Sequence, residues 1–208
     1  DILKSNPGRR NFPLKERLVI TLVTSQTNQV EADFMGVLDK VINQLEITRV
    51  QVNMTAKTEI IKSVLTAKGD VLVIIRGGGG DALFKVFDDL EVMQAIASFK
   101  GYRILGLGHT GNATLSDLVC DYAASTPTKA GLLIAENLEP FLKSKKETRD
   151  LDIRMGMLNE SIRFLEGEKG QLNSEIANQR KTIANLRVAT LFILLFTIAA
   201  LIFILIKK

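Results

Sequence analysis

Residues 71–80 of this chain, VLVIIRGGGG, restrict its fold more than any other stretch, because five apolar residues lead directly into an arginine and four glycines. A short run rich in Val and Ile and closed by Gly is typical of a buried strand in a parallel sheet. In α/β proteins, ligands bind in the loops that follow such strands. The stretch therefore predicts an α/β fold with a ligand site at the end of this strand.

The residues after the strand have the chemistry of a phosphate site. Glycine lets a ligand approach backbone N–H groups, and the Arg76 guanidinium can donate two parallel hydrogen bonds to a phosphate. A tight turn without a ligand is the alternative, although Arg beside four glycines is more than such a turn requires. The predicted phosphate-binding residues are Arg76, Gly77, Gly78, Gly79 and Gly80.

Apolar patterns around this strand alternate between strand and helix. Predicted strands cover residues 18–23, 47–54, 71–75 and 103–107, and predicted helices cover residues 30–45, 55–67, 82–99 and 113–122, with a last helix that ends near residue 142. This alternation predicts a doubly wound parallel sheet with helices on both faces. Since the carboxyl ends of parallel strands share one rim, Arg76 and His109 are expected there together.

Other polar residues are candidates for the same rim. His109 is the only histidine and lies among glycines in a loop, which favours a catalytic role over a buried structural one. Asp33 lies in the first turns of the first predicted helix, where a carboxylate either serves the site or stabilises the helix dipole. Thr126 and Thr128 supply hydroxyl groups, although helix capping explains Thr128 equally well.

Residues 188–206, VATLFILLFTIAALIFILI, are interrupted by only two polar residues, Thr190 and Thr197. This run of about nineteen residues is close to the roughly twenty that span a bilayer. Basic residues flank both of its ends, so charge specifies its orientation only weakly. No secretory signal is visible near the start, and the single cysteine, Cys120, fits a reducing compartment. The sequence predicts a tail anchor with the preceding domain in the cytoplasm.

Apolar residues before this run recur at the heptad spacing of a coiled coil. One heptad position holds Leu151, Leu158, Leu165, Leu172 and Leu186, and the other holds Met155, Ile162, Ile176 and Ile183. Lys169 and Gln179 interrupt the two series, and such polar residues cost stability while fixing register or oligomer number. A solvated helix does not require this repetition, so the pattern predicts a stalk that forms a homo-oligomer.

Three ordered segments resemble one known family. They read LVTSQTNQVEADF from residue 22, RGGGGDALFKVFDD from residue 76 and GLGHTGNATLSDLVCDYAASTPTKAG from residue 106. Together they are similar to the catalytic domain of the large subunit of bacterial exonuclease VII and cover about residues 14–140. Members of that family begin with an OB-fold domain that binds single strands, which these residues do not include.

The resemblance implies hydrolysis of phosphodiester bonds in single-stranded DNA, in a family regarded as needing no divalent metal, so no cofactor is expected. The family's catalytic aspartate, arginine and histidine fall on Asp33, Arg76 and His109. Arg76 and the glycine amides would offset charge on the phosphorane, His109 would act as general acid or base, and Asp33 would orient His109 or a water molecule. The family's second aspartate falls on Asn112, whose amide cannot act as a base.

Two hypotheses follow: a membrane-anchored nuclease, or a catalytically weakened nucleotide- or nucleic-acid-sensing module that signals through an oligomeric stalk. A scaffold that only oligomerises is a third. The expected partners are single-stranded DNA or a nucleotide, the lipid bilayer of a bacterial inner membrane, further copies of this chain and a small helical subunit. The formal charge of +4 tolerates a polyanion. The predicted boundaries are a lead-in over residues 1–16, the α/β domain over 17–143, the coiled coil over 144–187 and the transmembrane helix over 188–206.

Overall fold

The structure is a computed structural model that describes residues 9–26, 28–77, 84–107 and 114–206. The chain divides into two compact units, Asp1–Lys146 and Glu147–Lys208. One continuous helix, α5 (Pro127–Ile206), begins in the first unit and contains the described part of the second. Each unit is described in turn.

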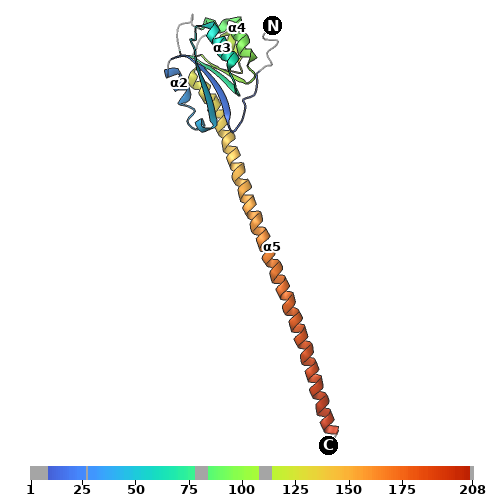
Figure 1. The fold of residues 1–208 in the computed structure, drawn as a ribbon. Coiled ribbons are helices and arrows are strands. Elements are labelled where there is room, and N and C mark those ends of the chain that lie inside the picture. Colours follow the sequence, from blue (N-terminus) through green and yellow to red (C-terminus); the bar gives the residue numbers. More distant parts are fainter. Residues whose placement is uncertain (1–8, 27, 78–83, 108–113, 207–208) are drawn as a thin grey trace. The chain divides into compact units, whose positions relative to one another are not determined.

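The first unit is built on a five-stranded sheet in which all neighbouring strands are parallel and the strand order is β2-β1-β3-β4-β5 (Figure 1). The strands are β1 (Leu18–Thr24), β2 (Leu45–Gln51), β3 (Val71–Ile75), β4 (Tyr102–Gly106) and β5 (Tyr122–Ala124). Every residue of β3 and β4 is buried, as expected for strands covered on both faces. The order reverses between β1 and β3, so this sheet has its switch point there.

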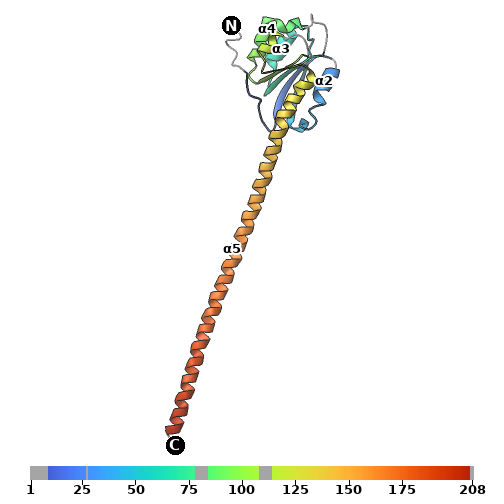
Figure 2. The same cartoon turned by 180° about the vertical axis from the view of Figure 1, so that it is seen from behind.

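Helices cover both faces of the sheet, which confirms the predicted α/β class (Figures 1 and 2). On one face, α2 (Asn28–Met35) and the first turns of α5 share a core that includes Phe34 and Ile134. On the other face, α3 (Lys57–Thr66) and α4 (Leu90–Ser98) share a core that includes Ile60 and Ile96.

Helix α5 approaches α2 closely because residue 131 is a glycine. A Cβ atom at Gly131 would lie 2.6 Å from the backbone oxygen of Phe34 and 2.5 Å from Cγ2 of Val37. Real Cβ atoms do not approach other atoms this closely, so any larger residue would push the helix away from its neighbours.

A buried ion pair joins Arg103 of β4 to Asp121, the residue just before the edge strand β5. The Asp121 carboxylate accepts hydrogen bonds from Nε and Nη2 of Arg103 at 2.9 and 2.8 Å, and both side chains are fully buried. The backbone N–H of Arg10 donates to the same carboxylate at 2.8 Å, and Phe12 packs edge-on against Tyr102. These contacts fix residues 10–12 against the sheet.

Four predicted helices differ from the structure. The helix predicted over residues 30–45 ends at Met35, where Gly36, a poor helix former, follows; a 3₁₀ turn, η1 (Ile42–Gln44), then leads into β2. The helix predicted over residues 82–99 is η3 (Lys85–Asp88) and α4, separated by Asp89, whose carboxylate caps α4 through Glu91 N. Residues 82 and 83 lie outside the described residues.

The third difference concerns residues 113–122, which were predicted as a helix. The described part forms a 3₁₀ turn, η4 (Leu115–Leu118), and then β5, a strand the sequence did not reveal. The turn is closed locally, since the Thr114 N–H donates to the Asp117 carboxylate at 2.9 Å. The ion pair to Arg103 then draws the chain alongside β4.

The predicted helix end near residue 142 is wrong, because α5 continues to Ile206 with Pro140 inside it. The residues after Pro140 contain many Lys and Glu and no early glycine, so nothing there stops the helix.

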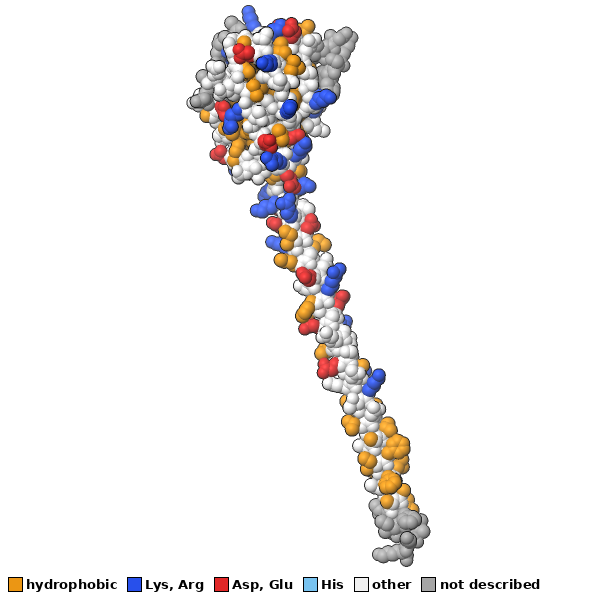
Figure 3. Space-filling view, viewed as in Figure 1, with side chains coloured by type: hydrophobic (Ala, Val, Ile, Leu, Met, Phe, Trp, Pro, Cys, Tyr) orange, Lys and Arg blue, Asp and Glu red, His pale blue; other side chains and the backbone are white. Residues whose placement is uncertain are grey.

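In the second unit, the described side chains of α5 are all exposed. Charged side chains are spread along the N-terminal part of this stretch of α5, and hydrophobic side chains dominate its surface toward the C-terminal end (Figure 3). Among the described residues, this is the one helix that is long and apolar enough to cross a membrane, with a mean hydropathy of 2.0 in its most apolar window and none of that window buried.

Candidate functional site

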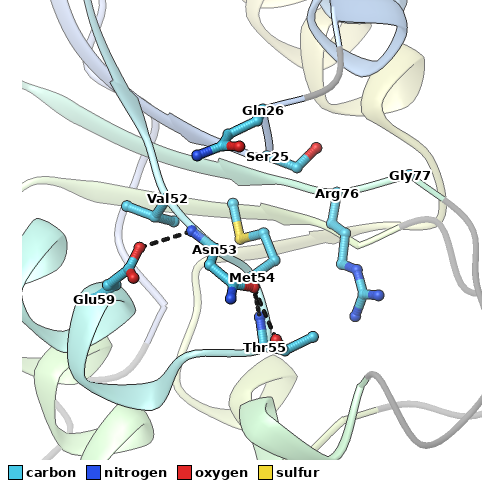
Figure 4. Close-up of a pocket in the computed structure, with 9 residues that line it drawn as sticks. All are labelled: Ser25, Gln26, Val52, Asn53, Met54, Thr55, Glu59, Arg76 and Gly77. Atoms are coloured by element: carbon cyan, nitrogen blue, oxygen red, sulfur yellow. Dashed lines mark hydrogen bonds between the residues drawn. The ribbon is translucent and has the colours of Figure 1, made fainter.

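A cavity of about 520 Å³ opens at the carboxyl ends of β1, β2 and β3 (Figure 4). Its lining residues are Ser25, Gln26, Val52, Asn53, Met54, Thr55, Glu59, Arg76 and Gly77. The cavity lies at the reversal of strand order between β1 and β3, which is where doubly wound sheets bind their ligands. Its volume is in the range of small-molecule binding sites.

Arg76 supplies the permanent positive charge of this cavity. Its backbone N–H donates to the Gly106 carbonyl at 3.1 Å, which extends the pairing of β3 with β4 by one residue. Its side chain is largely buried, with the guanidinium carbon 4.7 Å from the centre of the Phe84 ring. Burial lowers the pKa of this guanidinium, but arginine stays protonated in proteins. The stacked guanidinium thus retains a charge that can bind phosphate.

The residue after Arg76, Gly77, has no room for a side chain. A Cβ atom there would lie 2.9 Å from Cγ2 of Val30 in α2, so a larger residue would force a shift. The remaining predicted glycines, Gly78, Gly79 and Gly80, lie outside the described residues, and so do His109 and Asn112.

The side of the cavity opposite Arg76 is a polar wall from the start of α3 and the loop before it (Figure 4). Glu59 Oε2 accepts a hydrogen bond from the Asn53 backbone N–H at 2.8 Å. Asn53 Oδ1 accepts from both the N–H and the hydroxyl of Thr55, at 3.0 and 2.8 Å. Met54 lies between this wall and Arg76. The cavity therefore has a cation on one side, a carboxylate on the other and an apolar surface between them.

Sequence reasoning missed this wall. It placed residues 53 and 54 inside the second strand, but β2 ends at Gln51 and the loop begins with Val52. The available signal was the rule used for Arg76, namely that polar residues after a parallel strand lie at its carboxyl end. Applied to Asn53 and Thr55, the rule would have identified the wall.

The other predicted residues that the structure describes, Asp33, Thr126 and Thr128, do not line the cavity. Asp33 is exposed on α2, where its carboxylate accepts a hydrogen bond from Gln29 at 2.9 Å. Thr126 caps α5, since its hydroxyl oxygen accepts from the Lys129 N–H at 3.1 Å, and Thr128 lies in the first turn of that helix. Within the described ranges, no group of three or more His, Cys, Asp and Glu side chains is placed to hold a metal ion.

Comparison with known proteins identifies the family. The sequence model of the exonuclease VII large subunit family matches residues 9–190, which is most of the chain. The chain belongs to this family. The match confirms the resemblance seen in three motifs and extends past the α/β domain through the heptad region.

Several proteins called exodeoxyribonuclease 7 large subunit are similar to this family member. The one from Synechococcus sp. strain CC9311 is 31% identical over 187 residues, which cover 90% of this chain and 40% of the relative. The one from Legionella pneumophila strain Paris is 28% identical over 194 residues, covering 86% and 42%. The one from Acholeplasma laidlawii strain PG-8A is 29% identical over 152 residues, covering 70% and 34%. The chain spans about two fifths or less of the length of these relatives.

Proposed function

We propose that this chain is a membrane-anchored exonuclease VII-like protein that hydrolyses phosphodiester bonds of single-stranded DNA at the cavity beside Arg76. The observation that carries the proposal is the buried, permanently charged Arg76 in a cavity at the switch point of a sheet of this family. A guanidinium held in place by stacking loses little freedom when it binds a phosphate oxygen.

The chemistry proposed for the site separates charge stabilisation from proton transfer. Arg76 and the backbone amides from Gly77 onward offset the charge that develops on the phosphorane. His109 takes a proton from the attacking water or gives one to the leaving oxygen. Asp33 does not line the cavity, so in this proposal it orients His109 or a water molecule and does not touch the phosphate.

A second candidate function is a nucleotide- or nucleic-acid-sensing module with weakened catalysis. Asn112 stands where the family's second aspartate is expected, and an amide cannot accept a proton as a base. The cavity also has a carboxylate, Glu59, opposite its arginine, an arrangement that suits a single nucleotide as well as a strand.

The proposed location is a bacterial inner membrane, crossed once by residues 188–206 with the α/β domain in the cytoplasm. The support is the long apolar stretch of α5, whose described apolar side chains are exposed in the second unit and would be covered by lipid. The oligomeric stalk belongs to the same proposal, with further copies of this chain or a small helical subunit as its partners.

A cleavage assay tests the two functions against each other. The full chain in detergent is incubated with end-labelled single-stranded DNA, with and without EDTA, beside the variants His109→Ala and Asn112→Asp. The nuclease proposal expects cleavage by the wild type that survives EDTA and is lost in His109→Ala. An inert wild type, with cleavage gained by Asn112→Asp, would refute it and support the sensing module.

A further inference from the structure

One group in the cavity beside Arg76 does not suit a DNA backbone. Glu59 carries a carboxylate, which only accepts hydrogen bonds. The phosphate and sugar-ring oxygens of DNA are acceptors as well, so a carboxylate repels the backbone. The donors of a DNA strand lie on the edges of its bases and at its terminal hydroxyl groups. The position of Glu59 therefore points to a base or to a strand end.

We propose that the polar wall formed by Asn53, Thr55 and Glu59 is a nucleobase subsite, which prefers a base with an exocyclic amino group to thymine or uracil. The inference deepens the proposed function, on which it rests, because the base belongs to the nucleotide whose phosphate lies at Arg76. It concerns binding and does not require that the strand be cut.

The hydrogen bonds of Asn53 fix which atom of its amide can meet a ligand. Its Oδ1 accepts from the Thr55 backbone N–H at 3.0 Å and from the Thr55 hydroxyl at 2.8 Å. A backbone N–H can only donate, so the amide atom facing it is the oxygen and not the nitrogen. Asn53 is exposed, and its Nδ2 makes no hydrogen bond to any residue that the structure describes. This Nδ2 group can therefore donate to a base.

Glu59 presents an acceptor beside this donor. Its Oε2 accepts from the Asn53 backbone N–H at 2.8 Å, which holds the carboxylate against the loop. Its Oε1 has no hydrogen-bond partner in the described part of the chain, and the side chain is exposed. Asn53 and Glu59 thus offer a donor and an acceptor from one hydrogen-bonded unit.

An amino-bearing base complements this pair. In cytosine the N4 amino group donates and the neighbouring N3 accepts, and in adenine N6 and N1 do the same. Thymine and uracil have a carbonyl oxygen in place of the amino group. Their single donor, N3–H, lies between two carbonyl oxygens, so a carboxylate that approaches it is repelled on both sides. The charge of Glu59 therefore selects against these two bases.

Apolar side chains beside the polar atoms favour a base over a strand end. Val52 and Met54 line the same cavity and are 5% and 4% exposed. Met54 lies between the polar wall and Arg76 (Figure 4). The flat face of a base packs on apolar side chains of this kind, whereas a terminal hydroxyl has no use for them. The cavity thus offers a place for phosphate at Arg76, an apolar surface for the base and a polar wall for its edge.

The polar wall is held in place by backbone hydrogen bonds. The Val52 N–H donates to the Thr24 carbonyl at 3.0 Å, which continues the pairing of β1 with β2 into the loop. The Ala56 N–H donates to the Asn53 carbonyl at 2.9 Å, immediately before α3 begins. A wall fixed in this way loses little conformational freedom when a base binds.

The binding of two matched oligonucleotides tests the subsite. Dodecamers of deoxycytidine and deoxyuridine differ only in the hydrogen-bonding edge of the base. Each carries phosphorothioate linkages against cleavage, fluorescein at the 5′ end and a phosphate at the 3′ end, so neither has a terminal hydroxyl. Affinities for the full chain in detergent are measured by anisotropy at pH 8 and one fixed salt concentration. We expect the wild type to bind deoxycytidine at least about fivefold more tightly, as a well-formed pair of hydrogen bonds to a base edge allows.

Glu59→Gln should reduce this preference to within about twofold. An amide can accept from cytosine or donate to uracil, so the variant should bind deoxyuridine more tightly than the wild type and deoxycytidine less tightly. The matched control is Glu46→Gln, which removes a carboxylate of β2 that is 53% exposed and lies outside the cavity lining. This control should keep the wild-type preference.

Each other outcome identifies what has failed. Equal affinity of the wild type for both strands would overturn the subsite and leave the nuclease proposal standing. A Glu59→Gln variant that binds both strands more weakly, with the preference unchanged, would show that Glu59 only stabilises the loop and would overturn the subsite too. A wild type that shows the preference but cuts no DNA would refute the nuclease proposal alone. Binding of neither strand would overturn both.

Discussion

Removing the Asp121 carboxylate should strongly destabilise the α/β unit. The carboxylate accepts four hydrogen bonds, two from the Arg103 side chain and two from the backbone N–H groups of Arg103 and Arg10. Asp121→Asn would leave the fully buried Arg103 cation without its counter-charge. Breaking a buried pair in this way costs about 3–5 kcal/mol. At roughly 2–4 °C per kcal/mol, the midpoint of thermal unfolding should fall by about 6–20 °C.

The matched control is Glu139→Gln, which makes the same chemical change in an exposed pair. Lys40 and Glu139 are 74% and 49% exposed, and such pairs contribute about 0–1 kcal/mol. Both variants are compared with the wild type by circular dichroism in one detergent at pH 7. If the two variants unfolded within about 1 kcal/mol of each other, the argument from burial would be refuted.

The pH dependence of the same comparison has a definite sign. Burial alone would raise the pKa of the Asp121 carboxyl, but the hydrogen bonds from Arg103 and the Arg10 backbone outweigh it and lower this pKa below its ordinary value. The carboxylate therefore stabilises the fold above the unfolded pKa of about 3.9, and this contribution is lost as the pH falls through the lowered value. The difference between wild type and Asp121→Asn should shrink below about pH 4.

Two further predictions concern single atoms of the fold. Gly131→Ala should destabilise the first unit by about 1–3 kcal/mol, because the added Cβ would collide with α2, whereas Gly170→Ala, with nothing within 4 Å, should stabilise the helix by up to about 1 kcal/mol. Urea unfolding followed by helix content measures both changes in the free energy of unfolding. Changes of the same sign for the two variants would contradict the packing at Gly131. The Cys120 thiol is buried, and burial raises its pKa to about 12. A thiol reagent at pH 8 should therefore modify Cys120 at least about a hundredfold more slowly in the folded chain than in urea. Fast modification without denaturant would show that the thiol is accessible.

The sequence predicted the sheet well because its central strands are buried on both faces. The run around Ile74 is continuously apolar, and the run around Ile104 is apolar apart from Arg103; such runs have few alternatives in an α/β chain. The helix in front of β2 was predicted too long for a different reason. Leu38 and Val41 are buried as a helical period requires, but they reach the core from turns after Gly36. The spacing therefore predicted which residues are buried, but not that the backbone after Gly36 forms turns instead of a helix.

Strand β5 could not be read from the sequence, because what places it is not local. Residues Tyr122–Ala124 form a short strand without a distinctive pattern, and it pairs with β4 where the preceding Asp121 meets Arg103, eighteen residues earlier. The site, likewise, was predictable only in part. Arg76 could be predicted because four glycines follow it, whereas Asn53 and Glu59 join the site only through the folding of β2 and α3 beside β3.

The central claim is that the cavity beside Arg76 binds the phosphodiester backbone. The most direct test is the affinity of the full chain for a fluorescein-labelled oligodeoxythymidylate, measured by anisotropy at one fixed salt concentration. Arg76→Gln removes the buried cation, and Arg17→Gln removes an exposed one whose side chain is 77% accessible, with thermal unfolding as a check that both variants fold. Charge-assisted hydrogen bonds contribute about 1.5–3 kcal/mol, so the account predicts at least about tenfold weaker binding for Arg76→Gln and unchanged binding for Arg17→Gln. Wild-type affinity in a folded Arg76→Gln variant would contradict it.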